Sequence, residues 1–185
     1  VADIRPGNNV LIMGPGPIGL MAIRLAKKAG AQKIFVSALS GTVKRNQLAL
    51  DFGADAVIEV DRMALEGYRF PCLIDRVVST SPPSTLPSAM NIAAKGAIIA
   101  FIGFAGNSNP NIIFNANDFH VKKLQRRASF ASPATMGPLA IALLKEDRRI
   151  VDSLISHVFE LEQLSQAMET ALYKTMETVK IIVKV

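Results

Sequence analysis

The sequence is poor in the residues that build metal centres and disulfide frameworks. It has one cysteine, Cys72, and two histidines, His120 and His157. A single cysteine excludes an internal disulfide and favours a reducing compartment, so we expect a cytoplasmic protein in which Cys72 packs within its apolar run. The two histidines are distant in the chain and make no zinc-ligand set with one cysteine. We therefore expect no metal site here, and no Ser-His-Asp or paired-carboxylate pattern marks a catalytic residue.

Long apolar runs and clustered charge are also missing. The longest apolar stretch runs from Ala97 to Ala105, whereas a membrane-spanning helix needs about twenty residues. Lys and Arg number 21 against 15 Asp and Glu, a net charge of +6. The basic pairs are scattered without interleaved aromatic residues, which favours an anionic small molecule over a nucleic acid. We expect neither a membrane nor a nucleic acid as partner.

The most informative segment begins with Val10-Leu11-Ile12-Met13. This short apolar run is typical of a buried parallel strand. It leads into Gly14-x-Gly16-x-x-Gly19, after which apolar residues recur at the spacing of one helix face. Gly30 ends that pattern, as a glycine just beyond a helix does.

Each glycine of this segment has a mechanical role in a dinucleotide-binding turn. Gly14 permits the tight turn, Gly16 lets a pyrophosphate approach the backbone, and Gly19 lets the helix pack closely on the strand. Pro17 suits the first helical turn, and the amides of Ile18 and Gly19 face an anion at the positive end of the helix. A ligand-free turn between strand and helix can also carry glycines. The agreement of strand, spacing and helix favours a dinucleotide site that includes all five residues.

The rest of the chain alternates between strand and helix patterns. We expect strands at residues 33–38, 56–58, 72–78, 97–102, 125–132 and 181–185, with a strand-like segment at 157–159. We expect helices at 43–52, 84–94, 135–144 and 162–173, a helical turn at 61–67, and a loop at 103–117. Lys95-Gly96 is expected to close the helix at 84–94. The pattern predicts an α/β fold: a Rossmann-type doubly wound parallel sheet of six strands with helices on both faces.

These residues resemble the cofactor-binding domain of the medium-chain, zinc-dependent alcohol dehydrogenases, and most closely the sorbitol and threonine dehydrogenase branch. The resemblance covers nearly the whole chain in order. It rests on the segment from Arg5 to Gly19, on Arg45 and Phe52-Gly53-Ala54-Asp55, and on Lys95-Gly96, Ile102-Gly103, His157-x-Phe159-x-Leu161 and Ala167-Met168-Glu169.

The resemblance implies an oxidoreductase that transfers a hydride between an alcohol or polyol and the nicotinamide of NAD or NADP. In that family a separate amino-terminal domain with a groES-like fold holds the catalytic zinc. The resemblance therefore places zinc outside this chain and implies that the chain alone binds cofactor but catalyses little. The first strand follows Val1 almost at once, so we expect a domain of a longer protein. Residues 1–155 are the expected dinucleotide-binding domain, and residues 156–185 the expected segment that returns to the catalytic domain.

The end of the second expected strand bears on the choice between NAD and NADP. In NAD enzymes an acidic residue about twenty positions after the glycines binds the ribose 2′-hydroxyl. Ala38 stands where many relatives carry Asp, and Ser37 and Arg45 lie nearby. An arginine can pair with a 2′-phosphate through two hydrogen bonds. Arg45 matches a basic position that NAD users share, so the absent Asp carries more weight. The sequence slightly favours NADP.

Further cofactor contacts are expected from the carboxyl ends of the later strands, because ligands of open α/β sheets lie there. After the fourth strand these are Val78, Ser79 and Thr80. Relatives more often have a glycine at this point, which leaves the role of the Thr80 side chain open. The resemblance also implies that backbone groups after the fifth and sixth strands hold the nicotinamide amide: Ile102, Gly103, Phe104, Phe130 and Ala131.

Other functions and assemblies fit the same residues. A stand-alone nucleotide-binding regulatory module would lack a catalytic partner, and the reading frame upstream of Val1 distinguishes it from the enzyme. A zinc-free quinone-reductase-like enzyme is disfavoured by Pro17-Ile18, where such proteins usually have alanine and valine. The family pairs its cofactor domains through the last parallel strand, here 125–132, which implies a homo-oligomer. Basic residues beside that strand are equally suited to protect an unpaired edge: Lys122, Lys123, Arg126 and Arg127.

Overall fold

A computed structural model describes residues 1–106, 109–130, 134–173 and 176–185. Its main feature is a parallel sheet of six strands in the order β3-β2-β1-β4-β5-β6. The strands are β1 (Asn9–Met13), β2 (Lys33–Ala38), β3 (Ala56–Glu59), β4 (Ile74–Ser79), β5 (Ala93–Phe101) and β6 (Gln125–Ala128). The order reverses between β1 and β4, so the predicted doubly wound, Rossmann-type sheet is confirmed.

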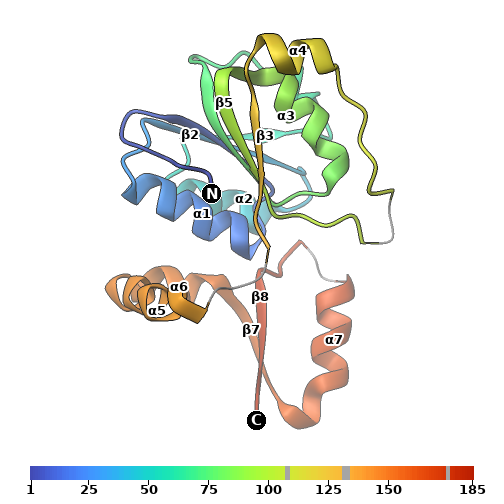
Figure 1. The fold of residues 1–185 in the computed structure, drawn as a ribbon. Helices are drawn as coiled ribbons and strands as arrows, with labels where there is room; N and C mark the ends of the chain where they lie inside the picture. Colours follow the sequence, from blue (N-terminus) through green and yellow to red (C-terminus); the bar gives the residue numbers. More distant parts are fainter. Residues whose placement is uncertain (107–108, 131–133, 174–175) are drawn as a thin grey trace.

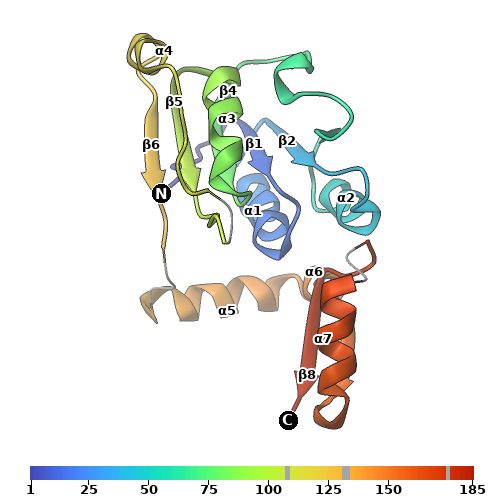
Figure 2. The same cartoon turned by 90° about the vertical axis from the view of Figure 1, so that its right-hand side faces the viewer.

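Helices cover both faces of this sheet (Figures 1 and 2). Those that pack on it are α1 (Pro17–Lys28) and α2 (Val43–Asp51) on one face and α3 (Leu86–Ile92) on the other. The remaining helices of the described residues are α4 (Ala116–Val121), α5 (Gly137–Glu146), α6 (Arg148–Leu154) and α7 (Leu164–Tyr173). Alternate residues of β1 point to opposite faces: Val10 and Ile12 pack with α1 and α2, and Leu11 and Met13 pack with α3. Both faces of β1 are therefore buried, which explains its uninterrupted apolar run.

Two helix ends follow directly from glycine chemistry. The α1 pattern ends at Gly30, and the α2 pattern ends at Gly53, as predicted. Both residues have positive φ angles, +86° and +111°, in the left-handed region that glycine adopts without a steric penalty.

Several boundaries differ from the sequence predictions, and four differences change how the chain is read. The strand β5 begins at Ala93, so Lys95-Gly96 lies within it and does not close α3. A register shift opposite β4 accommodates Gly96, whose φ is +79° and whose amide bonds the Lys122 carbonyl at 2.7 Å. The helix α4 begins inside the predicted loop, because the Asn115 side chain accepts hydrogen bonds from two amides of its first turn. The helix α6 was not predicted, and β6 ends at Ala128 rather than at residue 132.

A second, two-stranded parallel sheet lies beyond α5 and α6 (Figure 1). It is formed by β7 (Ile155–Glu160) and β8 (Lys180–Lys184), with α7 between them in sequence. The residue just before β8 packs against the main sheet, since Val179 is buried in the cluster that contains residues of α1 and β1. Within the described ranges no helix combines the length and the apolar character that crossing a membrane requires.

Candidate functional site

The site begins at the turn between β1 and α1. Gly14 has a φ of +94°, and its amide donates to the Ser37 carbonyl on β2 at 2.9 Å. Gly16 precedes the helix in extended conformation, and the first bond of the helix runs from the Leu20 amide to the Gly16 carbonyl at 2.8 Å. The amides of Ile18 and Gly19 thus have no carbonyl within the helix to bond. With no acidic side chain in this first turn, the helix end is suited to an anion.

At two positions the backbone packs so closely that only glycine fits. A Cβ atom at Gly19 would lie 1.9 Å from the Gly14 carbonyl oxygen, and one at Gly103 would lie 2.0 Å from the Ser81 carbonyl oxygen. A Cβ at Gly16, in contrast, would have no atom within 4 Å. Gly16 therefore leaves a free surface beside the helix end, which is where a pyrophosphate needs room.

The residue after β4 closes the other side of this turn. Thr80 donates its backbone amide to the Met13 carbonyl at 2.9 Å. Its Oγ1 lies 2.9 Å from the Met13 carbonyl oxygen and 3.1 Å from the Gly14 carbonyl oxygen. The Thr80 side chain therefore stabilises the glycine turn, which answers the question that the sequence left open.

A cavity of about 630 Å³ opens at the carboxyl ends of β1, β2 and β4. Six of the predicted cofactor residues line it: Gly14, Gly16, Ser37, Ala38, Arg45 and Thr80. Pro17, Ile18 and Gly19 form the first turn of α1 next to it. A dinucleotide fits this region chemically, because it offers unpaired amides, an open surface at Gly16 and a cation at Arg45.

A second cavity, of about 690 Å³, lies at the carboxyl ends of β5 and β6. It is lined by the predicted residues Ile102, Gly103, Phe104 and Phe130, and the two aromatic rings meet edge to face at 5.7 Å. The cavities adjoin after β4, where Pro82 lines the first and Pro83 the second. Together they offer two compartments on one edge of the sheet.

Two predicted residues, Val78 and Ser79, have a different role. Val78 and Ser79 are buried in the sheet and line neither cavity, and the Ser79 hydroxyl has no hydrogen-bond partner among the described residues. Their side chains serve the interior, because the last residues of β4 precede the point where the chain emerges. Ala131 lies outside the described residues.

The sequence did not predict that the segment after β3 lines part of the first cavity. Val60, Ala64, Leu65 and Glu66 line the first cavity. Burial alone would raise the pKa of Glu66, but hydrogen bonds from its own amide and from Ser88 and Asn91 outweigh burial and lower that pKa. The rule that ligands lie at the carboxyl ends of parallel strands could have found these residues, since the carboxyl end of β3 lies at the same edge of the sheet.

Arg45 is partly buried and hydrogen-bonded within the chain, unlike a fully exposed arginine. Its Nε donates to the carbonyl oxygen of Thr178 at 2.7 Å, and burial lowers the pKa of the guanidinium. The side chain thus bonds the segment before β8 while it also lines the first cavity. Arginine stays charged in proteins, so a positive group remains at this rim.

Comparisons with known proteins decide the family. A model of the family described as zinc-binding dehydrogenase matches residues 17–146. The chain belongs to that family. The zinc-binding dehydrogenase chain is similar to sorbitol dehydrogenase of Bacillus subtilis, with 32% identity over 191 residues that cover 97% of this chain and 51% of the relative. Sorbitol dehydrogenase of Gallus gallus is 29% identical over 190 residues, 99% of this chain and 51% of the relative.

A solved structure agrees with this assignment. The alcohol dehydrogenase TADH from Thermus sp. ATN1 superposes with a TM-score of 0.86 at 26% identity, over 99% of this chain and 53% of that protein. The zinc-binding dehydrogenase chain thus spans about half the length of the relatives it matches. The relatives named here are dehydrogenases of an alcohol or a polyol.

The zinc in the family's description finds no ligand set in the described part of this chain. No group of three or more His, Cys, Asp or Glu side chains lies close enough there to hold a metal ion. Burial, reinforced by the nearby Asp75 carboxylate, raises the pKa of the Cys72 thiol, so Cys72 is not a ready thiolate ligand. The described residues of this zinc-binding dehydrogenase chain therefore present the groups that a dinucleotide needs and no ligand set for zinc.

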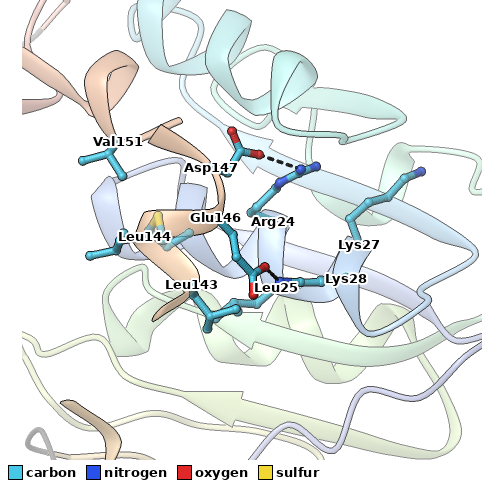
Figure 3. Close-up of a pocket in the computed structure, with 10 residues that line it drawn as sticks. Arg24, Leu25, Lys27, Lys28, Leu143, Leu144, Glu146, Asp147 and Val151 are labelled. Atoms are coloured by element: carbon cyan, nitrogen blue, oxygen red, sulfur yellow. Dashed lines mark hydrogen bonds and ion pairs between the residues drawn. The ribbon is translucent and has the colours of Figure 1, made fainter. Parts of the chain in front are cut away.

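A further cavity, of about 200 Å³, lies between α1 and the α5–α6 pair (Figure 3). Four of its charged side chains pair across it: Arg24 with Asp147 at 2.8 Å, and Lys28 with Glu146. Leu143 and Val151 supply apolar lining, and Lys27 also lines the cavity. The two ion pairs join α1 to α5 and α6.

Proposed function

We propose that this chain is the cofactor-binding part of an NAD(P)-linked dehydrogenase that acts on an alcohol or polyol. The observation that carries the proposal is the β1–α1 turn, in which unpaired amides and an open Gly16 face a cavity at the point where the strand order reverses. Such a point is where open α/β sheets bind dinucleotides. The relatives' names supply the substrate class.

The two cavities suit the two halves of a nicotinamide dinucleotide. The adenosine half would occupy the cavity beside Ala38 and Arg45, the pyrophosphate would lie at the amides of Ile18 and Gly19, and the nicotinamide would lie beside Phe104 and Gly103. When bound, the nicotinamide supplies the hydride chemistry. The chain's own residues bind and orient it, which matters because reacting atoms must approach within about 3–3.5 Å. Ala38 stands where many relatives carry an Asp that would face the adenine ribose, and the absence of that carboxylate supports NADP as the preferred form.

Calorimetric titration with NADH and NADPH tests this proposal. We expect saturable binding of at least one of them, and we expect Gly16→Asp to abolish it by placing a carboxylate where the pyrophosphate lies. A side chain at Gly16 meets no neighbour, so the variant should fold. Gly137→Asp is the matched control, because a side chain there also meets nothing and α5 lies away from both cavities. Failure of the parent to bind either nucleotide, or equal binding by Gly16→Asp, would contradict the proposal.

Residues 156–185 belong, in this proposal, to the interface with the rest of a longer protein. The supporting observation is an apolar stripe on α7: Leu164, Met168 and Leu172 follow one another at four-residue spacing and are 48%, 57% and 63% exposed. An exposed stripe of this kind requires a partner surface. A full-length protein should protect the α7 amides from hydrogen exchange better than this chain alone does.

Self-association through β6 is the remaining part of the proposal. The strand β6 forms one edge of the six-stranded sheet, and an edge strand that meets its copy satisfies its open backbone groups. Two of the neighbouring basic residues are engaged within the chain, since Lys122 bonds the carbonyls of Met90 and Asn91 and Arg127 bonds Val1 and Gln125. We expect a dimer by sedimentation, and a monomer for Arg126→Pro, which removes one donor from the edge. A monomeric parent would favour the protective role of the basic residues.

A further inference from the structure

The turn after β2 is held by a carboxylate from the turn after β3. The Ser40 amide donates to one carboxylate oxygen of Asp61 at 2.9 Å, and the Ser40 hydroxyl donates to the other at 2.7 Å. Asp61 reaches this position because the Val60 amide bonds the Ala38 carbonyl at 2.9 Å, which places the end of β3 beside the end of β2. Both donors of Ser40 are therefore occupied by a single anionic group.

This pair lies next to the first cavity, although neither of its two residues lines it. Its chain neighbours line that cavity: Leu39 and Thr42 on either side of Ser40, and Val60 next to Asp61. Ala38, the last residue of β2, also lines it. The end of β2 is where dinucleotide-binding sheets read the 2′ position of the adenine ribose. The strand β2 itself has no carboxylate at this edge, and Asp61 supplies one from the turn after β3.

Asp61 carries a negative charge at neutral pH. The hydrogen bonds from the Ser40 side chain and amide lower the pKa of its carboxyl group. An anion bound at this turn needs N–H and O–H donors, and a 2′-phosphate would bring nearly two negative charges to donors that Asp61 already holds. A ribose 2′-hydroxyl has the opposite requirement, because it can donate to the free lone pairs of the same carboxylate.

Arg45 places a positive charge beside the same cavity, where it would attract a phosphate that Asp61 repels. Arg45 lines the cavity, but its Nε is bound to the Thr178 carbonyl, so only the remaining nitrogens of its guanidinium can face a phosphate. The charged groups beside this cavity are therefore Arg45, which has one donor already used, Glu66 in the cavity lining, and Asp61, which holds both donors of Ser40.

We propose that Asp61, positioned by Ser40, is a specificity-determining residue of the nucleotide site, where its carboxylate lowers affinity for the 2′-phosphorylated cofactor relative to the unphosphorylated one. The inference rests on the proposed function. It assigns to a residue of the turn after β3 the discrimination that Ala38 cannot perform, and it limits the preference for NADP that Ala38 alone would favour.

The test compares dissociation constants for NADH and NADPH in the parent and in Asp61→Asn, measured by calorimetry in phosphate-free buffer of low ionic strength. Asn has nearly the same shape, keeps one acceptor for Ser40 and removes the charge. We expect the ratio of the two constants to shift at least tenfold toward NADPH, about 1.4 kcal/mol, mainly through tighter NADPH binding. Asp51→Asn is the matched control, because it removes the same charge from an exposed site on α2 that bonds only Gln47. It should leave the ratio within about twofold.

Each outcome decides between the proposals. If the parent binds both nucleotides and Asp61→Asn leaves their ratio unchanged, or shifts it toward NADH, Asp61 does not discriminate and this inference is overturned while the proposed function stands. An equal shift in Asp51→Asn would show a general charge effect and would also overturn it. If the parent binds neither nucleotide, the proposed function fails and the inference fails with it.

Discussion

The Nε of Arg45 and the carbonyl oxygen of Thr178 are 2.7 Å apart, although 133 residues separate them in the sequence. Thr178 and Val179 are buried, and Val179 packs in the core cluster shared by α1 and β1. The segment before β8 is therefore anchored to the nucleotide-binding sheet by one hydrogen bond and one buried side chain. The remainder of the second sheet extends away from this anchor (Figure 2).

Replacing Arg45 tests this anchor. Arg45→Lys keeps the charge but loses the planar Nε donor, so the Thr178 carbonyl loses a charged hydrogen bond worth about 1.5–3 kcal/mol. We expect faster hydrogen exchange across 178–185 and a small loss of stability in urea. Lys44→Met, an exposed neighbour on the same helix, should change neither. Unaltered exchange in Arg45→Lys would show that the buried Val179 side chain holds the segment by itself.

A pair of glycine variants separates folding from binding. Gly19→Ala places a Cβ against the Gly14 carbonyl oxygen at 1.9 Å, so the helix must shift, at a cost of about 1–3 kcal/mol. Gly16→Ala meets nothing within 4 Å, and its φ of −68° suits any residue. We expect it to keep or slightly raise stability, by up to about 1 kcal/mol, while it weakens NADH binding. Urea unfolding and calorimetry distinguish the two, and full NADH affinity in Gly16→Ala would mean that no pyrophosphate approaches this backbone.

The parts of the fold that depend on local signals could be predicted from the sequence. The apolar runs, the glycine turn and the helix-ending glycines at 30 and 53 each act within a few residues, and the sheet follows from their alternation. The start of β5 was missed because its extended pairing depends on a register shift against β4 rather than on its own residues. The Ser40–Asp61 pair was missed for a similar reason, since only the pairing of β2 with β3 brings together the turns that follow them.

Thr80→Val tests the role of the hydroxyl beside the glycine turn. Valine keeps the shape but removes the hydrogen bonds to the carbonyls of Met13 and Gly14. The Thr80 amide still bonds Met13, so we expect a loss of about 1 kcal/mol in unfolding free energy. A looser turn should weaken NADH binding by about fivefold, a similar free energy. Thr80→Ser restores the hydroxyl and should recover both quantities; if it recovers neither, the methyl group rather than the hydroxyl is what matters.

The hydrogen bonds of Asp55 beside the start of β2 predict how stability depends on pH. Burial alone would raise the pKa of Asp55, but hydrogen bonds from Lys33 at 2.7 Å and from the Ile34 amide at 2.8 Å outweigh burial and lower it. A carboxyl group whose pKa is lower in the folded state stabilises the fold above its unfolded pKa of about 3.9, and this contribution is lost as pH falls through the folded value.

Asp55→Asn should therefore cost about 1 kcal/mol at pH 7, a modest figure because the pair is partly exposed. The difference between parent and variant should persist down to about pH 4 and shrink below it, as followed by urea unfolding across this range. A difference that stayed constant into acid would mean that the carboxylate charge does not contribute, and that Asp55 acts only through the shape and neutral hydrogen bonding of its side chain.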